Sequence, residues 1–252
     1  MTGVSDVQLA RQIAVEAGVL LCDIRANAEH GGKALGDQGD ALANQLILER
    51  LHAARPADFV LSEESTDDRT RCSARRVWIV DPLDGTREYA EGRDDWAVHI
   101  ALSIDGCPDA AAVSLPAAGR VLTTDDTVPD YPALPAVPRM VVSRSRPHAV
   151  TLHVATAIGA ALLPMGSAGA KAMAVVDGIA DAYLHDGGQY EWDNCAPAAV
   201  AIAAGLHVSR IDGSPLVYNC QNPFLPDLLI CRRELAEPIL AEVRAYKAKK
   251  QD

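Results

Sequence analysis

The hydrophobic positions in the first half of the chain predict two helices followed by a set of short strands. Apolar side chains recur at helical spacing over residues 6–26, where Ser5 or Asp6 is the expected N-cap, and again over residues 40–54. The polar stretch between them, 27–36, contains two adjacent glycines and predicts a turn. Short apolar runs then indicate strands at 59–61, 77–80, 96–104, 110–115 and 120–124.

In the second half of the chain the pattern changes to an alternation of strands and helices, which is typical of a layered α/β fold. Prolines repeated between Pro129 and Pro138 mark the change and are the best candidate for a domain boundary. We therefore expect an N-terminal α+β domain over residues 1–135 and a C-terminal α/β domain over residues 136–252. The predicted strands here are 140–143, 161–165, 180–184, 206–211 and 228–231, and the predicted helices are 148–159, 168–177, 193–204 and 234–248.

Composition and charge restrict the classes of function. The 252 residues are 49% hydrophobic and 23% charged, and neither a membrane span nor a signal peptide is visible, so a cytoplasmic location is expected. The net charge of −11 argues against binding to nucleic acid polymers or to anionic membranes. The six cysteines are scattered without a C-x-x-C pair and are expected to be free thiols.

Candidate chemistry is concentrated in the stretch Asp81-Pro82-Leu83-Asp84-Gly85-Thr86, which follows the apolar run at 77–80. Because Pro82 lacks an N–H group, the strand ladder is predicted to stop there. Two carboxylates three residues apart then precede a Gly-Thr pair at an expected helix start. Such an arrangement can hold a metal ion and an anion together. The alternative is an Asp-rich surface turn.

Three further acidic residues lie at the ends of predicted elements. Glu63 follows a strand, whereas Asp40 and Asp193 open helices. Taken singly, the two aspartates are ordinary N-caps and Glu63 is a solvated side chain. If they converge with the central stretch, two charges about 4 Å apart cost roughly 4 kcal/mol at an effective dielectric of 20, so the cluster must take up protons or bind cations. Oxygen ligands without nearby His or Cys pairs favour Mg²⁺ or Mn²⁺ over zinc.

Three segments together resemble the signatures of the inositol monophosphatase superfamily of Mg²⁺-dependent, lithium-sensitive phosphatases. They are Ser62-Glu63-Glu64-Ser65, the central stretch 81–86 and Trp192-Asp193. Residues 93–99 and 166–173 further resemble the CysQ-type 3′-phosphoadenosine 5′-phosphate phosphatases. The resemblance implies a layered αβαβα sandwich, catalysis with two or three Mg²⁺ ions, inhibition by Li⁺ and a homodimer.

The resemblance also implies which residues hold the metal ions. Glu63, Asp81 and the backbone carbonyl of Leu83 would bind the first ion, which holds the attacking water. Asp81, Asp84 and Asp193 would bind the second ion, which stabilises the oxygen of the leaving group. A pair of ions in this arrangement is a common means of in-line displacement at phosphorus.

The same resemblance assigns the catalytic and phosphate-binding groups. Thr86, hydrogen-bonded to Asp40, would orient and deprotonate the attacking water, so Asp40, Thr86 and Glu63 form the predicted catalytic group. The N–H groups of Gly85 and Thr86 would hold the phosphate oxygens. Asp37, three residues before Asp40, is expected to be a solvated turn residue.

Substrate contacts are expected from the second half of the chain. Lys171 resembles the lysine that nucleotide-cleaving members present to a second phosphate, and the sequence around Arg144 offers further positive charge. Several of those members have an arginine near the position of His185, which leaves nucleotide specificity open. The complete set of expected substrate contacts is Ser143, Arg144, Ser167, Lys171, His185 and Asp186.

The leading hypothesis is a phosphatase that removes the 3′-phosphate of 3′-phosphoadenosine 5′-phosphate, a by-product of sulfate assimilation, to give AMP. Inositol monophosphatase and fructose-1,6-bisphosphatase activities are the nearest enzymatic alternatives. A different class is a non-catalytic scaffold or RNA-binding dimer on the same fold. That reading predicts the loss of at least one acid or of Thr86, and all of them are present.

Overall fold

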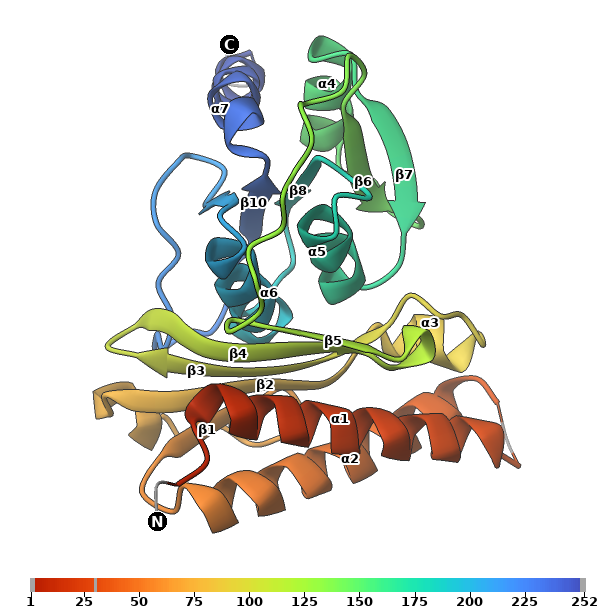
Figure 1. Ribbon diagram of the computed structural model, residues 1–252, viewed down its shortest axis with the longest axis vertical. Coiled ribbons are helices and arrows are strands. Elements are labelled where there is room, and N and C mark those ends of the chain that lie inside the picture. The colour runs from red at the N-terminus through yellow and green to blue at the C-terminus, as the bar shows by residue number, and fades with distance from the viewer. Residues whose placement is uncertain (1–2, 30, 250–252) are drawn as a thin grey trace.

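The computed structural model describes residues 3–29 and 31–249, which form alternating layers of helices and sheets (Figure 1). Helices α1 and α2 cover the outer face of the first sheet, α5 and α6 lie between the sheets, and α4 and α7 cover the outer face of the second. The predicted αβαβα sandwich is confirmed. The helices are α1 (Asp6–Ala26), α2 (Lys33–Ala54), α3 (Thr86–Ala90), α4 (Ala149–Ala157), α5 (Ala168–Val176), α6 (Glu191–Ala203) and α7 (Arg233–Ala248), with two short 3-10 helices at Thr70–Ser73 and Pro116–Ala118.

The first sheet contains β1 to β5 in sequence order. Strand β1 runs parallel to β2, and every later strand is antiparallel to the one before it. Because β1 and β2 are parallel, their carboxyl ends lie at the same edge of the sheet. The strands are β1 (Phe59–Ser62), β2 (Arg76–Asp84), β3 (Ala97–Ile104), β4 (Cys107–Leu115) and β5 (Arg120–Thr123).

The second sheet has the strand order β7-β6-β8-β10-β9. Strands β7 and β8 run parallel to β6 on either side of it, and β10 is antiparallel to both β8 and β9. Helices α4 and α5 make the connections between the parallel strands, as the alternating sequence pattern predicts. The strands are β6 (Arg139–Ser143), β7 (Ala161–Met165), β8 (Ala182–Asp186), β9 (His207–Ser209) and β10 (Asp227–Cys231).

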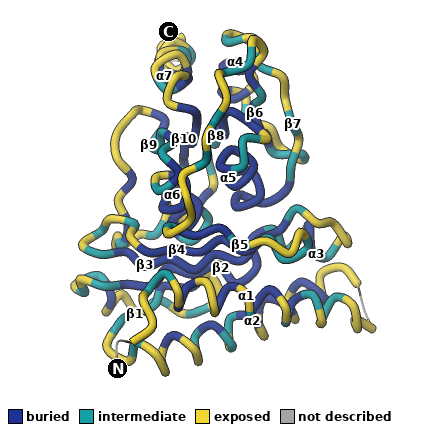
Figure 2. Tube along the Cα trace, viewed as in Figure 1, coloured by how far each residue is buried: buried dark blue, intermediate teal, exposed yellow. Residues whose placement is uncertain are grey.

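Three buried clusters of apolar side chains hold the layers together. The buried stretches of the chain in Figure 2 lie along the sheets and the helices between them. Strand β3 contributes to two of them by alternation: Ala97 and Ala101 face the helices between the sheets, whereas Val98 and Ile100 face α1 and α2. The cluster between the two sheets therefore contains residues from both halves of the chain. The predicted division at residues 135/136 falls in the segment that joins β5 to β6, and the division into domains stays a prediction.

Helix α2 begins earlier than the sequence pattern predicts. It starts at Lys33 rather than at residue 40, so the predicted turn at 27–36 is too long by one helical turn, and both Asp37 and Asp40 lie inside the helix. The glycine content of the first turns lowers their helix propensity, but close packing requires it. A Cβ atom at Gly36 would lie 2.7 Å from Cγ2 of Thr86. Packing against α3 thus overrides the local preference.

Two expectations from composition can be compared with the structure. The six cysteines are all free, as predicted. Of the helices in the described part of the chain, none has both the length and the apolar composition that crossing a membrane requires.

Candidate active site

An irregularity in β2 brings the two aspartates of the central stretch to the same face of the sheet. Asp81 pairs with His99 and Asp84 with Ala97, so three steps along β2 match two steps along β3. In a regular strand, residues three apart point to opposite faces. The extra residue of this bulge turns both carboxylates toward α5 and α6. The prediction that the ladder stops at Pro82 is therefore wrong, because the pairing shifts register there and resumes at Asp84.

Backbone and side-chain donors hold the Asp84 carboxylate from two directions. The N–H groups of Ala168 and Gly169, in the first turn of α5, donate to Oδ1 and Oδ2 at 3.1 and 2.6 Å. The Nε2 atom of His99 lies 3.2 Å from Oδ2. Burial alone would raise the pKa of Asp84, but His99 and the α5 N–H groups outweigh it and lower the pKa. The same contact raises the pKa of His99 despite its burial.

Asp193 completes a group of three carboxylates. Helix α6 starts at Glu191, so Asp193 lies in its first turn rather than at the N-cap, and it accepts a hydrogen bond of 2.6 Å from the N–H of Tyr190. One carboxylate oxygen from each of Asp81, Asp84 and Asp193 lies within 4.8 Å of the others. Burial, and then the charge of Asp84, raise the pKa of Asp193 to about 6. Such closely spaced oxygen donors fit a hard divalent cation.

Glu63 lies on the open side of this group. Its N–H donates to the Val80 carbonyl at 3.2 Å, which places it level with Asp81 at the adjacent strand end. The residue is solvent-exposed, but the protein surrounds its carboxyl closely enough that burial, followed by the charge of Asp193, raises the pKa of Glu63 to about 8. Asp81 is 1% exposed, and burial and then Glu63 raise its pKa well above the usual range. These carboxylates therefore form one interacting cluster, and their assignment as metal ligands stays a prediction.

Asp40 approaches the cluster from α2. It is 6% exposed, and its Oδ1 has no hydrogen-bond partner in the part of the chain that the structure describes. Burial, and then the charge of Glu64, raise the pKa of Asp40 to about 7, which the nearby Thr86 hydroxyl partly offsets. That hydroxyl donates to the Leu83 carbonyl at 3.1 Å, which lies three residues before Thr86 and closes a turn with it. Because the hydroxyl is also close enough to Asp40 to lower its pKa, the predicted hydrogen bond between Thr86 and Asp40 stays a prediction.

The turn at Gly85 requires glycine on two grounds. Its φ is +87°, and a Cβ atom there would lie 2.8 Å from Cβ of Ser167. Ser167 caps α5 by accepting a hydrogen bond of 3.0 Å from the N–H of Ala170. The predicted phosphate-binding turn therefore packs directly against the start of α5, beside the carboxylates.

Lys171 is placed differently from the expectation of a substrate contact. It is 5% exposed, and its ammonium donates to the carbonyls of Gly166 and Ser167, the latter at 2.6 Å. Its Nζ also lies 5.3 Å from the centre of the Tyr183 ring. Burial lowers the pKa of Lys171, and nearby carboxylates, Asp84 first among them, oppose this. Lys171 thus contacts the turn before α5, and a contact between this residue and substrate stays a prediction.

The other expected substrate contacts lie around the carboxyl ends of β6 and β8. Arg144 forms ion pairs of 2.8 and 2.5 Å with Glu88 and Glu91 of the α3 region. Ser143 accepts a hydrogen bond of 3.2 Å from the N–H of Arg146.

On β8, half-buried Asp186 pairs in register with Asp227, and Nε2 of His185 lies 2.7 Å from the Gly187 carbonyl. Burial, and then His148, lower the pKa of His185 to about 4, so this ring is neutral near pH 7. Their roles toward substrate stay predictions.

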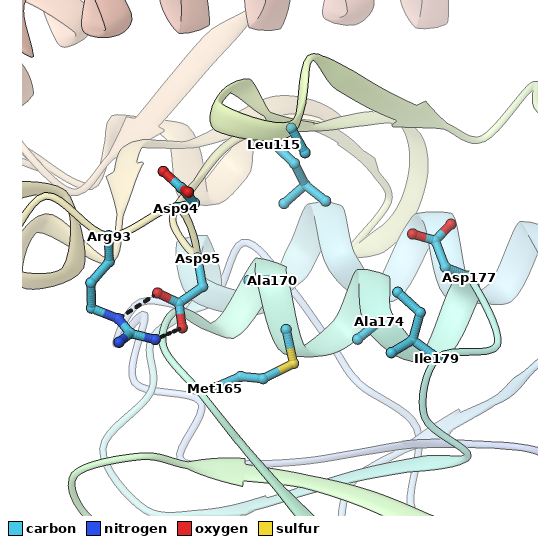
Figure 3. Close-up of a pocket in the computed structure, with 10 residues that line it drawn as sticks. Arg93, Asp94, Asp95, Leu115, Met165, Ala170, Ala174, Asp177 and Ile179 are labelled. Atoms are coloured by element: carbon cyan, nitrogen blue, oxygen red, sulfur yellow. Dashed lines mark hydrogen bonds and ion pairs between the residues drawn. The ribbon is translucent and has the colours of Figure 1, made fainter. Parts of the chain in front are cut away.

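A cavity of about 500 Å³ lies next to α5 but apart from the carboxylate cluster (Figure 3). Its floor is largely apolar and includes Met165 and Ile179, and the ion pair between Arg93 and Asp95 stands at one end. The Asp95 carboxylate also accepts a hydrogen bond of 2.6 Å from the N–H of Gly166. This ion pair therefore supports the turn that leads into α5.

Sequence reasoning missed two residues that shape the site. His99 was visible only as part of the segment 93–99, although a histidine within an apolar strand is a signal for a buried polar contact. The second missed residue is Gly169, where the neighbouring side chains leave no space for a Cβ atom. A Cβ atom at Gly169 would overlap Nε2 of His99 and lie 3.1 Å from Oδ2 of Asp84. Only glycine lets the first turn of α5 come this close to the carboxylate.

Comparison with solved structures shows the class of fold. The structure of CysQ from Bacteroides thetaiotaomicron matches with a TM-score of 0.78 at 24% identity, over 91% of this chain and 98% of that chain. Inositol monophosphatase II from Staphylococcus aureus matches with a TM-score of 0.78 at 20% identity, over 93% of this chain and 94% of the other. The layers of helices and sheets thus belong to the fold that these two proteins share.

The family model described as "Inositol monophosphatase family" matches residues 5–129 and 138–248, and the chain belongs to this family. It is 50% identical over 254 residues to the 3′-phosphoadenosine 5′-phosphate phosphatase of Mycobacterium leprae, with 95% of this chain and 94% of the relative covered. It is also 33% identical over 207 residues to 3′(2′),5′-bisphosphate nucleotidase CysQ of Escherichia coli K12, with 74% and 80% covered. The predicted family is confirmed, and both it and the cluster of Asp81, Asp84 and Asp193 support metal-dependent catalysis.

Proposed function

We propose that this protein is a Mg²⁺-dependent phosphatase that hydrolyses the 3′-phosphate of 3′-phosphoadenosine 5′-phosphate to give AMP and phosphate. The observation that carries the proposal is the meeting of Asp81, Asp84 and Asp193 within 4.8 Å beside the Gly85 turn. The name of the Mycobacterium leprae relative with 50% identity supports the substrate. Clearing this by-product of sulfate assimilation is the role that fits such an activity.

The chain's own residues would divide the work as follows. Two or three Mg²⁺ ions, or Mn²⁺ ions in their place, would be held by Glu63, Asp81, the Leu83 carbonyl, Asp84 and Asp193. Bound Mg²⁺ supplies positive charge for the developing anionic oxygens and lowers the pKa of water. Because the pKa of Asp40 is raised to about 7, its carboxylate can accept a proton near neutral pH through the Thr86 hydroxyl. The N–H groups of Gly85 and Thr86 would bind the phosphate oxygens.

Exposed aromatic side chains beside the cluster favour a nucleotide over a polyol. The rings of Tyr190 and Trp192 stack with centroids 4.9 Å apart, and Phe224 meets Tyr190 edge-on at 5.4 Å. Tyr190 is 40% exposed, and its backbone N–H contacts the Asp193 carboxylate. A nucleobase that stacks on an aromatic side chain gains roughly 1–3 kcal/mol. Inositol and fructose phosphates have no aromatic ring that could stack on this surface as a nucleobase does.

Two cations close to Thr86 are candidates for binding the second phosphate. Lys33 and Arg87 line a cavity of about 450 Å³ together with Thr86. Each pairs with an acid one helical turn away, Lys33 with Asp37 at 2.6 Å and Arg87 with Glu91 at 2.9 Å. Because exposed pairs of this kind are worth only about 0.3–0.5 kcal/mol, a dianionic phosphate could exchange them readily.

A phosphate-release assay with a panel of substrates tests the proposal. The panel contains 3′-phosphoadenosine 5′-phosphate, inositol 1-phosphate and fructose 1,6-bisphosphate, each with Mg²⁺, with Mn²⁺ and with EDTA. We expect the highest kcat/KM for the nucleotide, no turnover in EDTA, and inhibition by Li⁺. A preference for inositol 1-phosphate would defeat the nucleotide assignment, and turnover in EDTA would defeat the metal assignment. A homodimer and a cytoplasmic location are part of the proposal, and gel filtration with light scattering tests the first.

A further inference from the structure

We infer that His99 is a positioning residue that sets the distance between the two metal ligands contributed by different halves of the chain, Asp84 and Asp193. The inference rests on the metal-dependent site of the proposed function. It concerns an uncommon placement for a histidine, fully buried in the middle of β3 and 0% exposed. The side chain shares the face of Ala97 and Ala101, which is covered by the helices between the sheets.

The two ring nitrogens of His99 face opposite sides of the site: Nδ1 has a hydrogen-bond partner, whereas Nε2 makes an ion-pair contact without hydrogen-bond geometry. Nε2 lies 3.2 Å from Oδ2 of Asp84, which belongs to the first sheet. Nδ1 lies 3.0 Å from the backbone carbonyl of Trp192, which belongs to the first turn of α6. Because Asp193 directly follows Trp192, the imidazole links the carboxylate of Asp84 to the backbone one residue before Asp193. We call this link the bridge. Asp81 is the cross-strand neighbour of His99, so the bridge starts from the same strand pair that carries the third carboxylate.

Among the described residues, the His99 ring joins Asp84 to the first turn of α6 by an ion-pair contact at one nitrogen and a hydrogen bond at the other. The α5 N–H groups of Ala168 and Gly169 hold Asp84 but do not touch α6 through these bonds. Asp193 is held within its own helix by the N–H of Tyr190. Removing the ring would therefore leave each carboxylate oriented and α6 packed on the first sheet, but it would remove the polar contact that fixes the spacing of the two carboxylates. Groups that orient metal ligands from behind typically change metal affinity 10–100-fold when they are lost.

Two substitutions separate the halves of the bridge. In His99→Asn the side-chain amide occupies the position of Nδ1 and keeps the bond to the Trp192 carbonyl, whereas in His99→Gln it reaches the position of Nε2 and keeps the contact with Asp84. Ser103→Ala is the matched control, because Ser103 is buried on the same face of the same strand and its hydroxyl has no partner in the described structure. All three remove or replace one small polar group in a packed strand.

The measurement is Mn²⁺ and Mg²⁺ binding to the full-length protein without substrate, by electron paramagnetic resonance and calorimetry. The expected result is at least about tenfold weaker binding in both histidine variants and unchanged binding in Ser103→Ala. Thermal unfolding in EDTA is followed in parallel, because a purely structural role would lower the melting temperature without changing metal affinity. Under saturating Mg²⁺, KM for the nucleotide should return to the wild-type value.

Unchanged metal affinity in both histidine variants would overturn the inference, and so would equal weakening in the Ser103→Ala control. Weaker binding in only one variant would also overturn it, because a bridge requires both ends. The readout is independent of the substrate assignment. If the wild-type protein binds metal but hydrolyses no bisphosphate nucleotide, the proposed function fails while the role of His99 can still be measured.

Discussion

Replacing Asp40 with asparagine should stabilise the metal-free protein and at the same time remove its activity. Burial and the neighbouring Glu64 raise the pKa of this carboxyl from its ordinary value of 3.8 to about 7. A group whose pKa is higher in the folded state costs stability as the pH rises above its unfolded-state pKa, and the full cost is reached above its folded-state pKa. At about 1.4 kcal/mol for each tenfold change in proton affinity, the cost is roughly 4 kcal/mol at pH 8 and roughly 2 kcal/mol at pH 5.5.

The assay is urea unfolding followed by circular dichroism in EDTA at both pH values. Asp40→Asn should raise the free energy of unfolding by up to about 4 kcal/mol at pH 8 and by about half as much at pH 5.5. Asp37→Asn is the matched control on the same helix, because that carboxylate is exposed and pairs only with Lys33, and its effect should stay within about 0.5 kcal/mol. A gain that is equal at the two pH values, or a loss of stability at pH 8, would refute the electrostatic reasoning. In Mg²⁺, kcat of Asp40→Asn should fall about 10²–10⁴-fold.

Three further changes test separate parts of the site. Asp81→Asn removes a carboxylate from the cluster, so calorimetry should show metal binding at least about tenfold weaker and kcat should fall sharply, whereas near-normal turnover would contradict the ligand assignment. Gly169→Ala forces a methyl group against His99 and Asp84, so it should lower both the melting temperature and kcat. If both values equal those of the wild type, α5 can move away from the strand without loss of stability or activity. Arg87→Gln should raise KM for 3′-phosphoadenosine 5′-phosphate several-fold but leave KM for inositol 1-phosphate unchanged, and equal effects on both substrates would count against a second phosphate site there.

Much of the architecture could be predicted from the sequence because the signals are local. The apolar spacing of α1, with Ser5 or Asp6 expected as its N-cap, placed that helix correctly at both ends, and the structure shows a capping box between Ser5 and Gln8. The alternation in the second half predicted strands and helices in turn and a layered α/β arrangement. Local signals failed at α2, where Gly36 at the end of the predicted turn belongs to the helix and packs closely on Thr86 of α3.

The sequence by itself determined the chemical inventory of the site: which acids lie at the ends of elements, and that hard cations would suit them. Only the tertiary structure decided how these acids meet. The bulge at Pro82 turns Asp81 and Asp84 to one face, and the imidazole of His99 ties Asp84 to the backbone beside Asp193, more than 100 residues further along the chain. The reason is physical, because residue spacing fixes periodicity within one element, whereas register shifts and contacts between elements depend on the packing of the whole chain.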